Sequence, residues 1–248
     1  MGVAVTVPVE FGELTGLSRQ ERLDHLRRRM AAVPARGEAA NTYLRKEVLP
    51  VPEALAAILP NGGLAKGSVV SFSGATSLLL GLLATVTGNG GNAGVIGRPG
   101  LSLLAATEMG AQLRRIALIP EPGPDPVEVA AVLLDGLDLV VLDLGGGQVA
   151  PSRSRAVVAR ARSRGSTLLV SHGQFSGVEL RLDARVVGYR GLGRGTGRLR
   201  SMQVAVRAQG RACGLRTTRL DLQPGAGAME WVPAAEQSDV EFPQAVSW

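Results

Sequence analysis

The stretch VVSFSGATSL at residues 69–78 has the order of a strand, a tight turn and the start of a helix. A phosphate-binding loop with the pattern GxxxxGK[ST] follows a strand in the same way, because its backbone amides and lysine hold phosphates and its hydroxyl binds magnesium. Here Ala75 stands in the place of the lysine, and Val69, inside the strand, stands in the place of the first glycine. We therefore predict a plain strand-to-helix turn. The remnant of a phosphate loop would comprise Ser73, Gly74, Ala75 and Thr76.

Around this stretch, short apolar runs alternate with longer helical segments as far as residue 171. Continuous apolar character is typical of strands buried on both faces, so we predict an α/β fold with a mainly parallel sheet flanked by helices. The predicted strands are 69–73, 93–97, 116–120, 139–143 and 167–171, and the predicted helices are 77–88, 101–113, 126–136 and 151–164.

The two ends of the chain differ from this centre. Residues 17–33 have the apolar spacing of a helix, with Ser18 and Glu21 as a capping box. After residue 171 the pattern favours strands at 184–190, 201–208 and 217–222. We predict an N-terminal helical segment and linker at 1–58, with a short helix possible at 52–58, a core at 59–222 and a flexible acidic tail at 223–248.

Three aromatic residues stand out in the tail, namely Trp231, Phe242 and Trp248. Aromatic side chains in an acidic, weakly periodic segment are typical of a peptide that docks into a partner's groove. The alternative is that they fold back onto their own domain.

Charge is concentrated in one part of the chain. Residues 1–143 carry 12 basic and 14 acidic groups, residues 144–222 carry 15 and 3, and residues 223–248 carry none and 4. A basic block of this kind indicates contact with nucleic acid or an acidic partner, with an arginine-rich solvated surface as the alternative. The candidate residues are Arg190, Arg194, Arg198, Arg200, Arg207 and Arg211.

The composition argues against several classes of protein. One cysteine and two histidines make a disulfide framework or a zinc site improbable, so we expect no metal. The first residues lack the pattern of a secretory signal, and the longest apolar stretch, 78–86, is too short to span a bilayer. We expect a cytoplasmic protein without a membrane role.

Candidate catalytic residues are few. Asp143 ends an apolar strand, as does the aspartate that holds magnesium in P-loop ATPases. His172 follows another strand and is interpreted as a vestige or a satisfied histidine at the sheet edge, whereas His25 is expected to face solvent. We therefore expect no enzyme activity and no bound cofactor.

The segment LPNGGLAKG at 59–67 resembles the turn that enters the RecA ATPase core, and AGVIGRPG, LDLVVLD and TLLVSHG fall in RecA-like order over residues 59–222. This resemblance places Ala75 on the RecA lysine and Pro99 at or beside the glutamate that activates water. Short, arginine-rich chains with both positions lost and an N-terminal helix are similar to the ImuA′ family of actinobacteria, within the ImuA, SulA and RecA-related group.

The resemblance implies a non-catalytic adaptor in damage-induced translesion synthesis and mutagenesis, part of the SOS response. Its expected partner is an ImuB-type Y-family polymerase homologue, and through it an error-prone C-family DNA polymerase and the sliding clamp; DNA is a further candidate. Alternatives are a SulA-like inhibitor of cell division, a plain DNA-binding module, and a divergent ATP-dependent, DNA-binding RecA-like ATPase that draws a lysine such as Lys66 from elsewhere.

Overall fold

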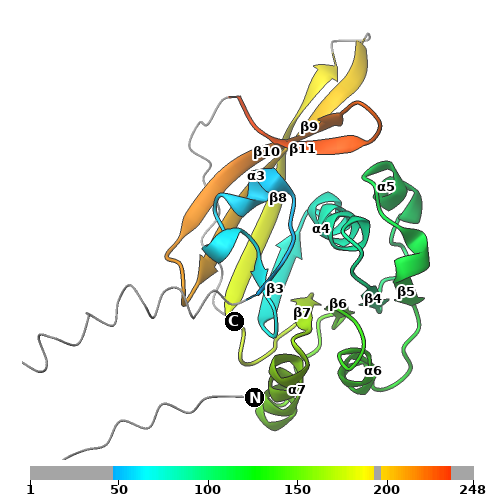
Figure 1. The fold of residues 1–248 in the computed structure, drawn as a ribbon, viewed down its shortest axis with the longest axis vertical. Coiled ribbons are helices and arrows are strands. Elements are labelled where there is room, and N and C mark those ends of the chain that lie inside the picture. The colour runs from blue at the N-terminus through cyan, green and yellow to red at the C-terminus, as the bar shows by residue number, and fades with distance from the viewer. Residues whose placement is uncertain (1–46, 193–196, 236–248) are drawn as a thin grey trace, which may run out of the picture. The chain divides into compact units, whose positions relative to one another are not determined.

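The computed structural model describes residues 47–192 and 197–235 (Figure 1). The predicted N-terminal helix at 17–33, Arg194, Phe242 and Trp248 lie outside these ranges. The described residues form a nine-stranded sheet in the order β11-β10-β9-β8-β3-β7-β6-β4-β5, beside a two-stranded sheet of β1 and β2. The large sheet is parallel from β8 to β5 and antiparallel from β8 to β11.

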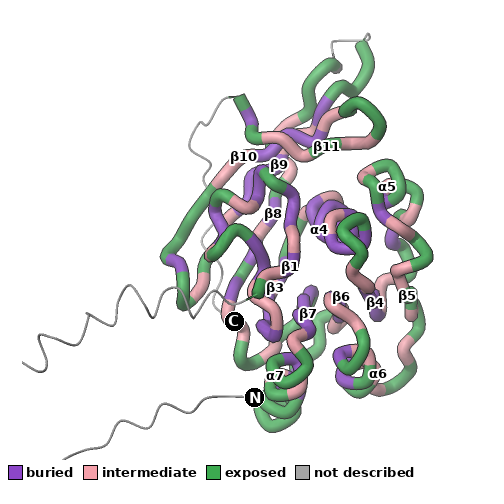
Figure 2. The backbone as a smooth tube through the Cα atoms, in the orientation of Figure 1, coloured by how far each residue is buried: buried purple, intermediate pink, exposed green. Residues whose placement is uncertain are grey.

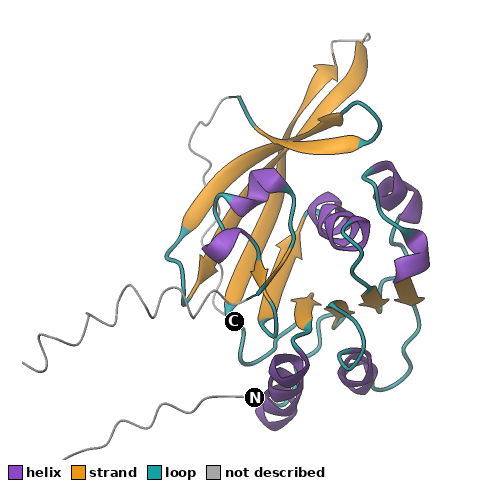
Figure 3. Ribbon diagram, in the orientation of Figure 1, coloured by secondary structure: helices purple, strands orange, loops and turns teal. Residues whose placement is uncertain are grey.

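The parallel half confirms the predicted α/β class. Its strands are β3 (Val69–Gly74), β4 (Ala93–Ile96), β5 (Ile116–Ile119), β6 (Leu139–Asp143) and β7 (Thr167–Ser171). Four helices flank it, namely α4 (Thr76–Gly88), α5 (Leu103–Glu108), α6 (Pro126–Leu133) and α7 (Pro151–Arg164) (Figure 3). One core cluster lies on the side of α4 and α5, and a second lies beneath α6 and α7. The α4 helix is buried along most of its length (Figure 2).

One predicted helix is shorter than expected. The segment 101–113 forms α5, which Ser102 caps by accepting a hydrogen bond from the Ala105 amide at 3.4 Å, and then a short 3-10 turn η3 (Leu113–Arg115). The helix stops because Gly110 has φ of +92°, a left-handed conformation that ends a helix.

The antiparallel half consists of β8 (Leu180–Leu192), β9 (Gly197–Gly210), β10 (Arg216–Pro224) and β11 (Met229–Pro233). The prediction of a flexible tail from residue 223 is wrong for the first part of that segment. β10 continues to Pro224, and β11 pairs with it in antiparallel register, for example Leu222 with Trp231. The signal for β11 is weak because the strand has only five residues and ends at a proline.

The predicted boundary at residue 58 is also displaced. The short strands β1 (Val48–Leu49) and β2 (Leu64–Ala65) pair, and α3 (Glu53–Ala56) and the 3-10 turn η2 (Pro60–Gly62) connect them. Leu49, Val51 and Leu55 are buried in the same core cluster as β3 and α4. Contacts along the chain divide it between residues 45 and 46, so the residues from 47 onward belong to the core unit.

Part of the basic block stabilises the packing of α7 against α6. Asp135 accepts hydrogen bonds from Arg160 at 2.5 Å and from Arg164 at 3.1 Å. These arginines, with Arg160 as the main cause, lower the pKa of Asp135 to about 2. Arg153 likewise lowers the pKa of Asp125 through a hydrogen bond of 2.6 Å. Four of the five arginines of α7, namely Arg153, Arg160, Arg162 and Arg164, therefore pair with carboxylates. No helix in the described ranges is long and apolar enough to cross a membrane.

Candidate functional site

The turn after β3 is closed against the neighbouring strand. Gly74 pairs with Ala184 of β8, and the Ala75 amide donates to the Ala184 carbonyl oxygen at 2.8 Å. Helix α4 begins at Thr76, so a single residue separates the strand from the helix. Gly74 has φ of +92°, and a Cβ there would overlap the Ala184 oxygen. The Ala75 amide is therefore engaged in a sheet contact at the position where a phosphate loop would present a backbone donor.

The other predicted vestiges lie close to this turn. The Ser73 hydroxyl donates to Asp183 Oδ1 at 2.5 Å, and Thr76 faces Arg98 across 3.3 Å. Pro99 is exposed in the loop that follows β4 and carries no group that could activate water. These residues lie near one another because the carboxyl ends of parallel strands meet at one edge of the sheet.

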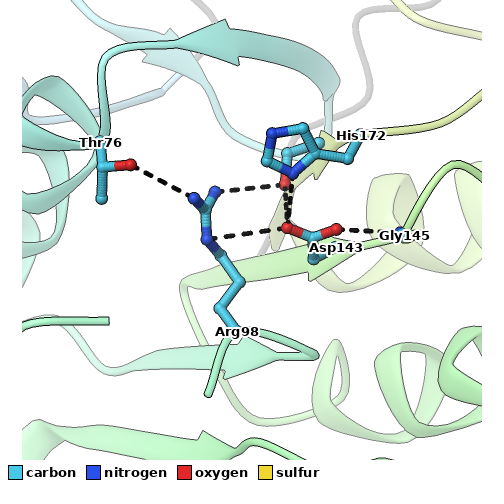
Figure 4. Close-up of polar contacts among 6 residues, drawn as sticks. Thr76, Arg98, Asp143, Gly145 and His172 are labelled. Carbon is cyan, nitrogen blue, oxygen red and sulfur yellow. Dashed lines mark hydrogen bonds and ion pairs between the residues drawn. The ribbon is translucent and has the colours of Figure 1, made fainter. Parts of the chain in front are cut away.

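Asp143 is the centre of a polar cluster at the same edge (Figure 4). Its side chain is 10% exposed, and Oδ1 accepts a hydrogen bond from the Gly145 amide at 2.9 Å. Oδ2 accepts from the Ser171 hydroxyl at 3.3 Å and lies 2.7 Å from His172 Nδ1. Both carboxylate oxygens therefore have partners within the protein.

Arg98 supplies the charge that opposes Asp143. Its Nε lies 3.7 Å from Asp143 Oδ2, while Nη2 donates to the Thr76 hydroxyl at 3.3 Å and Nη1 to the Ser171 hydroxyl at 3.5 Å (Figure 4). The Arg98 side chain is only 13% exposed. A permanent guanidinium charge thus lies between the start of α4 and the carboxylate, where RecA-like ATPases would place a magnesium ion.

Sequence analysis did not select Arg98 or Ser171. A signal was present, because Arg98 directly follows the predicted strand 93–97 and Ser171 ends the strand 167–171. His172 was correctly placed at the end of a buried strand, and it has an unusual positive φ of 47°. The Asp143 carboxylate orients its Nδ1 and leaves the ring half exposed. Among the described residues, no group of three or more His, Cys, Asp or Glu side chains could hold a metal ion.

Lys66 lies at the wrong end of β3 to replace the missing lysine. It precedes the strand, and its Nζ pairs with Glu47 at 3.1 Å. Gly74 ends the same strand, which spans about 17 Å from Val69 to Gly74 at 3.3 Å per residue. The hypothesis of a lysine supplied by Lys66 therefore finds no support in the geometry.

The predicted basic residues lie on the antiparallel strands and in their connections. Arg190, Arg198 and Arg200 line a hollow of about 610 Å³ near the end of the β8–β9 hairpin. Arg211 lines a second hollow, of about 370 Å³, together with Arg181. Arg207 lies on β9 between them. The structure thus spreads these residues along the antiparallel half rather than gathering them in one loop.

Trp231 is part of the protein's own packing. It lies on β11 against the core cluster, and Gly81 of α4 makes room for its ring, since a Cβ at Gly81 would overlap the indole nitrogen. For this residue the alternative of folding back describes the structure, and the prediction of a free docking side chain is wrong. The reason is that β11 pairs with β10 and turns the indole towards α4.

Comparison with known proteins agrees with this architecture. A family model described as the MT3502 N-terminal domain matches residues 57–177. The uncharacterized protein Rv3395c of Mycobacterium tuberculosis (strain ATCC 25618 / H37Rv) is 48% identical over 200 residues, which cover 77% of this chain and 93% of that protein. A RadB recombinase structure matches with a TM-score of 0.53 at 16% identity, covering 73% of this chain and 97% of its own. The chain therefore belongs to the family of Rv3395c and has a RecA-like fold.

Proposed function

We propose that this chain is a non-catalytic RecA-like accessory protein that acts in damage-induced translesion synthesis by binding other proteins. Its direct partner would be an ImuB-type Y-family polymerase homologue, which would connect it with an error-prone C-family polymerase and the sliding clamp. The damage-induced role and these partners come from the resemblance to the ImuA′ family. The RecA-like fold and the relationship with Rv3395c support a RecA-related protein in general.

The observation that carries the non-catalytic part is the pairing of Arg98 with Asp143 beside a closed turn. A magnesium ion at Asp143 would meet the fixed positive charge of Arg98, and like charges at this distance repel. The phosphates would also lack the amide cradle, because the Ala75 amide is bound to β8. Both features disfavour a magnesium–nucleotide complex at this edge of the sheet.

We expect no saturable binding of ATP to the full chain at millimolar nucleotide and magnesium, and no hydrolysis above the buffer rate. Isothermal titration calorimetry measures the first and release of inorganic phosphate the second. Asp143→Ala provides the control, since a true ATPase would lose turnover in this variant. A stoichiometric ATP complex, or turnover that Asp143→Ala abolishes, would contradict the non-catalytic assignment.

The adaptor part is supported by an apolar surface at the β5 end of the sheet. β5 is an edge strand and lies between α5 and α6 in Figure 1. Large apolar side chains are exposed on the elements of this edge, namely Leu104 on α5, Leu113 on η3, Leu118 on β5 and Val132 on α6. Edge strands with exposed apolar neighbours can accept a strand from another protein, which gives backbone hydrogen bonds together with apolar contacts.

We expect Leu118→Glu to weaken co-purification with the ImuB-type protein by at least about tenfold, because a charge would be buried in the contact. The control is Leu215→Glu, which changes another exposed leucine, 56% exposed against 38% for Leu118, in the connection between β9 and β10. The measurement is the dissociation constant from biolayer interferometry with purified partner. Equal effects of the two variants would show that β5 is not the contact.

A further inference from the structure

One face of the antiparallel strands lies in the core, and no helix among the described residues packs against the other face. Val204, Val206 and Ala208 of β9 belong to the core cluster beside α4, so the odd-numbered residues of β9 point to the opposite face. On that opposite face α7 packs against β7. None of the described residues of β8, β9 or β10 belongs to the core cluster beneath α6 and α7. We call this face, beyond α7 and within the described part of the chain, the open face.

Strand register gathers arginines on this open face. Arg185 and Arg219 both pair with Ala205, one from each side, and Arg181 pairs with Gln209. Because residues 205 and 209 share a face with Arg207, these four arginines lie on the same side of the sheet. The five arginines of the open face are Arg181, Arg185, Arg190, Arg207 and Arg219.

A β-bulge adds the fifth of these arginines. Val186 pairs with Val204 but Gly188 pairs with Gln203, so β8 carries one extra residue at this point. Strict alternation would place Arg185 and Arg190 on opposite faces. The bulge reverses the alternation, and Arg190 pairs with Ser201 on the same face as the others.

Few carboxylates oppose this charge. Asp183 accepts a hydrogen bond from the Ser73 hydroxyl. Asp221 is 4% exposed, and its carboxylate lies 3.7 Å from the Arg190 guanidinium. Within the described residues, Arg181 and Arg185 are exposed and form no ion pair with a carboxylate, in contrast to the arginines of α7. Among the described residues, the open face therefore carries more arginines than carboxylates, and Arg181 and Arg185 keep their charges without a carboxylate partner.

We propose that the open face of β8, β9 and β10 binds the phosphodiester backbone of double-stranded DNA. Guanidinium groups match phosphate oxygens in a bidentate fork. Arg181 pairs with Gln209 and Arg190 pairs with Ser201, and these two positions of β9 are eight residues apart. This separation is about 27 Å, which is the length of roughly eight base pairs of DNA. The hollows lined by Arg211 and by Arg198 extend the charge beyond both ends.

The composition of the face favours DNA over an acidic protein segment. The strongest contacts of protein interfaces are mostly buried anchors in packed pockets, whereas the central row of this face consists of Arg185, Ala205 and Arg219. No aromatic residue stands among the described residues that this register places on the face, so the contact would use phosphates rather than stacked bases. This inference is independent of the proposed adaptor role, since it rests on the arginine arrangement alone.

The test is fluorescence anisotropy of the full chain with a labelled duplex of 20 base pairs and with a single strand of 20 nucleotides, between 50 and 200 mM salt. Three phosphate contacts, from Arg181, Arg185 and Arg207, correspond to a slope of about −2.7 in a plot of log K against log salt concentration. We expect Arg181→Gln/Arg185→Gln to weaken duplex binding by about tenfold and to reduce the slope by about 1.8. The matched control Arg114→Gln/Arg155→Gln removes the same charge from η3 and α7, and should change affinity by less than about twofold.

Three results would overturn the proposal. The first is that both double variants weaken binding equally, since net charge would then account for the effect. The second is that the wild-type chain binds no duplex at 50 mM salt, or binds the single strand more tightly, which would require base stacking. The third is that polyglutamate at equal charge displaces the duplex, since the face would then be a site for acidic protein.

Discussion

Gly74→Val is expected to lower the free energy of unfolding by about 4 kcal/mol or more, a loss of the size seen when backbone strain and steric overlap combine. Gly74 has φ of +92°, a conformation that a β-branched residue rarely adopts. In addition, its Cβ would overlap the carbonyl oxygen of Ala184, which belongs to the backbone of β8 and cannot move without breaking strand pairing. Urea denaturation followed by circular dichroism measures the change.

Gly90→Val separates the two causes. Gly90 has φ of +89°, nearly the same value, but no atom lies within 4 Å of the Cβ position. This variant should therefore lose only the conformational term, about 1 to 2 kcal/mol. If both variants lose the same amount, the contact with Ala184 contributes nothing and the turn is not fixed by β8. Glycine would then be needed at position 74 only because of its positive φ.

The parallel half of the fold follows from local sequence. Each of its strands is a short apolar run, as expected for strands that helices cover on both faces of a sheet. The strands at 139–143 and 167–171 match the prediction to the residue. The helix at 151–164 also matches, because Pro151 starts it and Gly165, in the left-handed conformation, ends it. These elements are determined by residues within their own segments.

The antiparallel half depends on contacts that are distant in sequence. β8 begins four residues before the predicted start at residue 184, because it pairs with β3 from Leu180 onward and backbone pairing needs no particular side chain. β11 exists because β10 offers an edge and Gly81 leaves space for Trp231. The shared face of Arg185 and Arg190 depends on a bulge that alternation cannot foresee.

The candidate site was partly predictable for the same reason. Asp143, His172 and the turn at Gly74 were located because they end strands of a parallel sheet. The role of Arg98 could not be predicted, because it depends on the direction of its side chain in the loop after β4. Only the structure shows that its guanidinium reaches both Thr76 and Asp143.

Asp143→Leu is expected to destabilise the protein by about 3 kcal/mol, because Arg98 would keep its charge in a site where its side chain is 13% exposed. Arg98→Met should cost less, about 1 to 2 kcal/mol, since Asp143 keeps the Gly145 amide, the Ser171 hydroxyl and His172 as partners. The two losses are unequal because the carboxylate has several partners, whereas its loss leaves the guanidinium only two hydroxyls.

The double variant Arg98→Met/Asp143→Leu should lose less than the sum of the two single losses, by at least about 1 kcal/mol, because no unpaired charge remains. Free energies of unfolding from urea denaturation of the wild type and the three variants complete the cycle. Additive losses would mean that the two groups do not interact, and Asp143 would then keep an unneutralised charge that could hold a metal ion. A clear coupling means that the pair of Arg98 and Asp143 contributes to stability, with the arginine occupying the carboxylate that a nucleotide's magnesium would need.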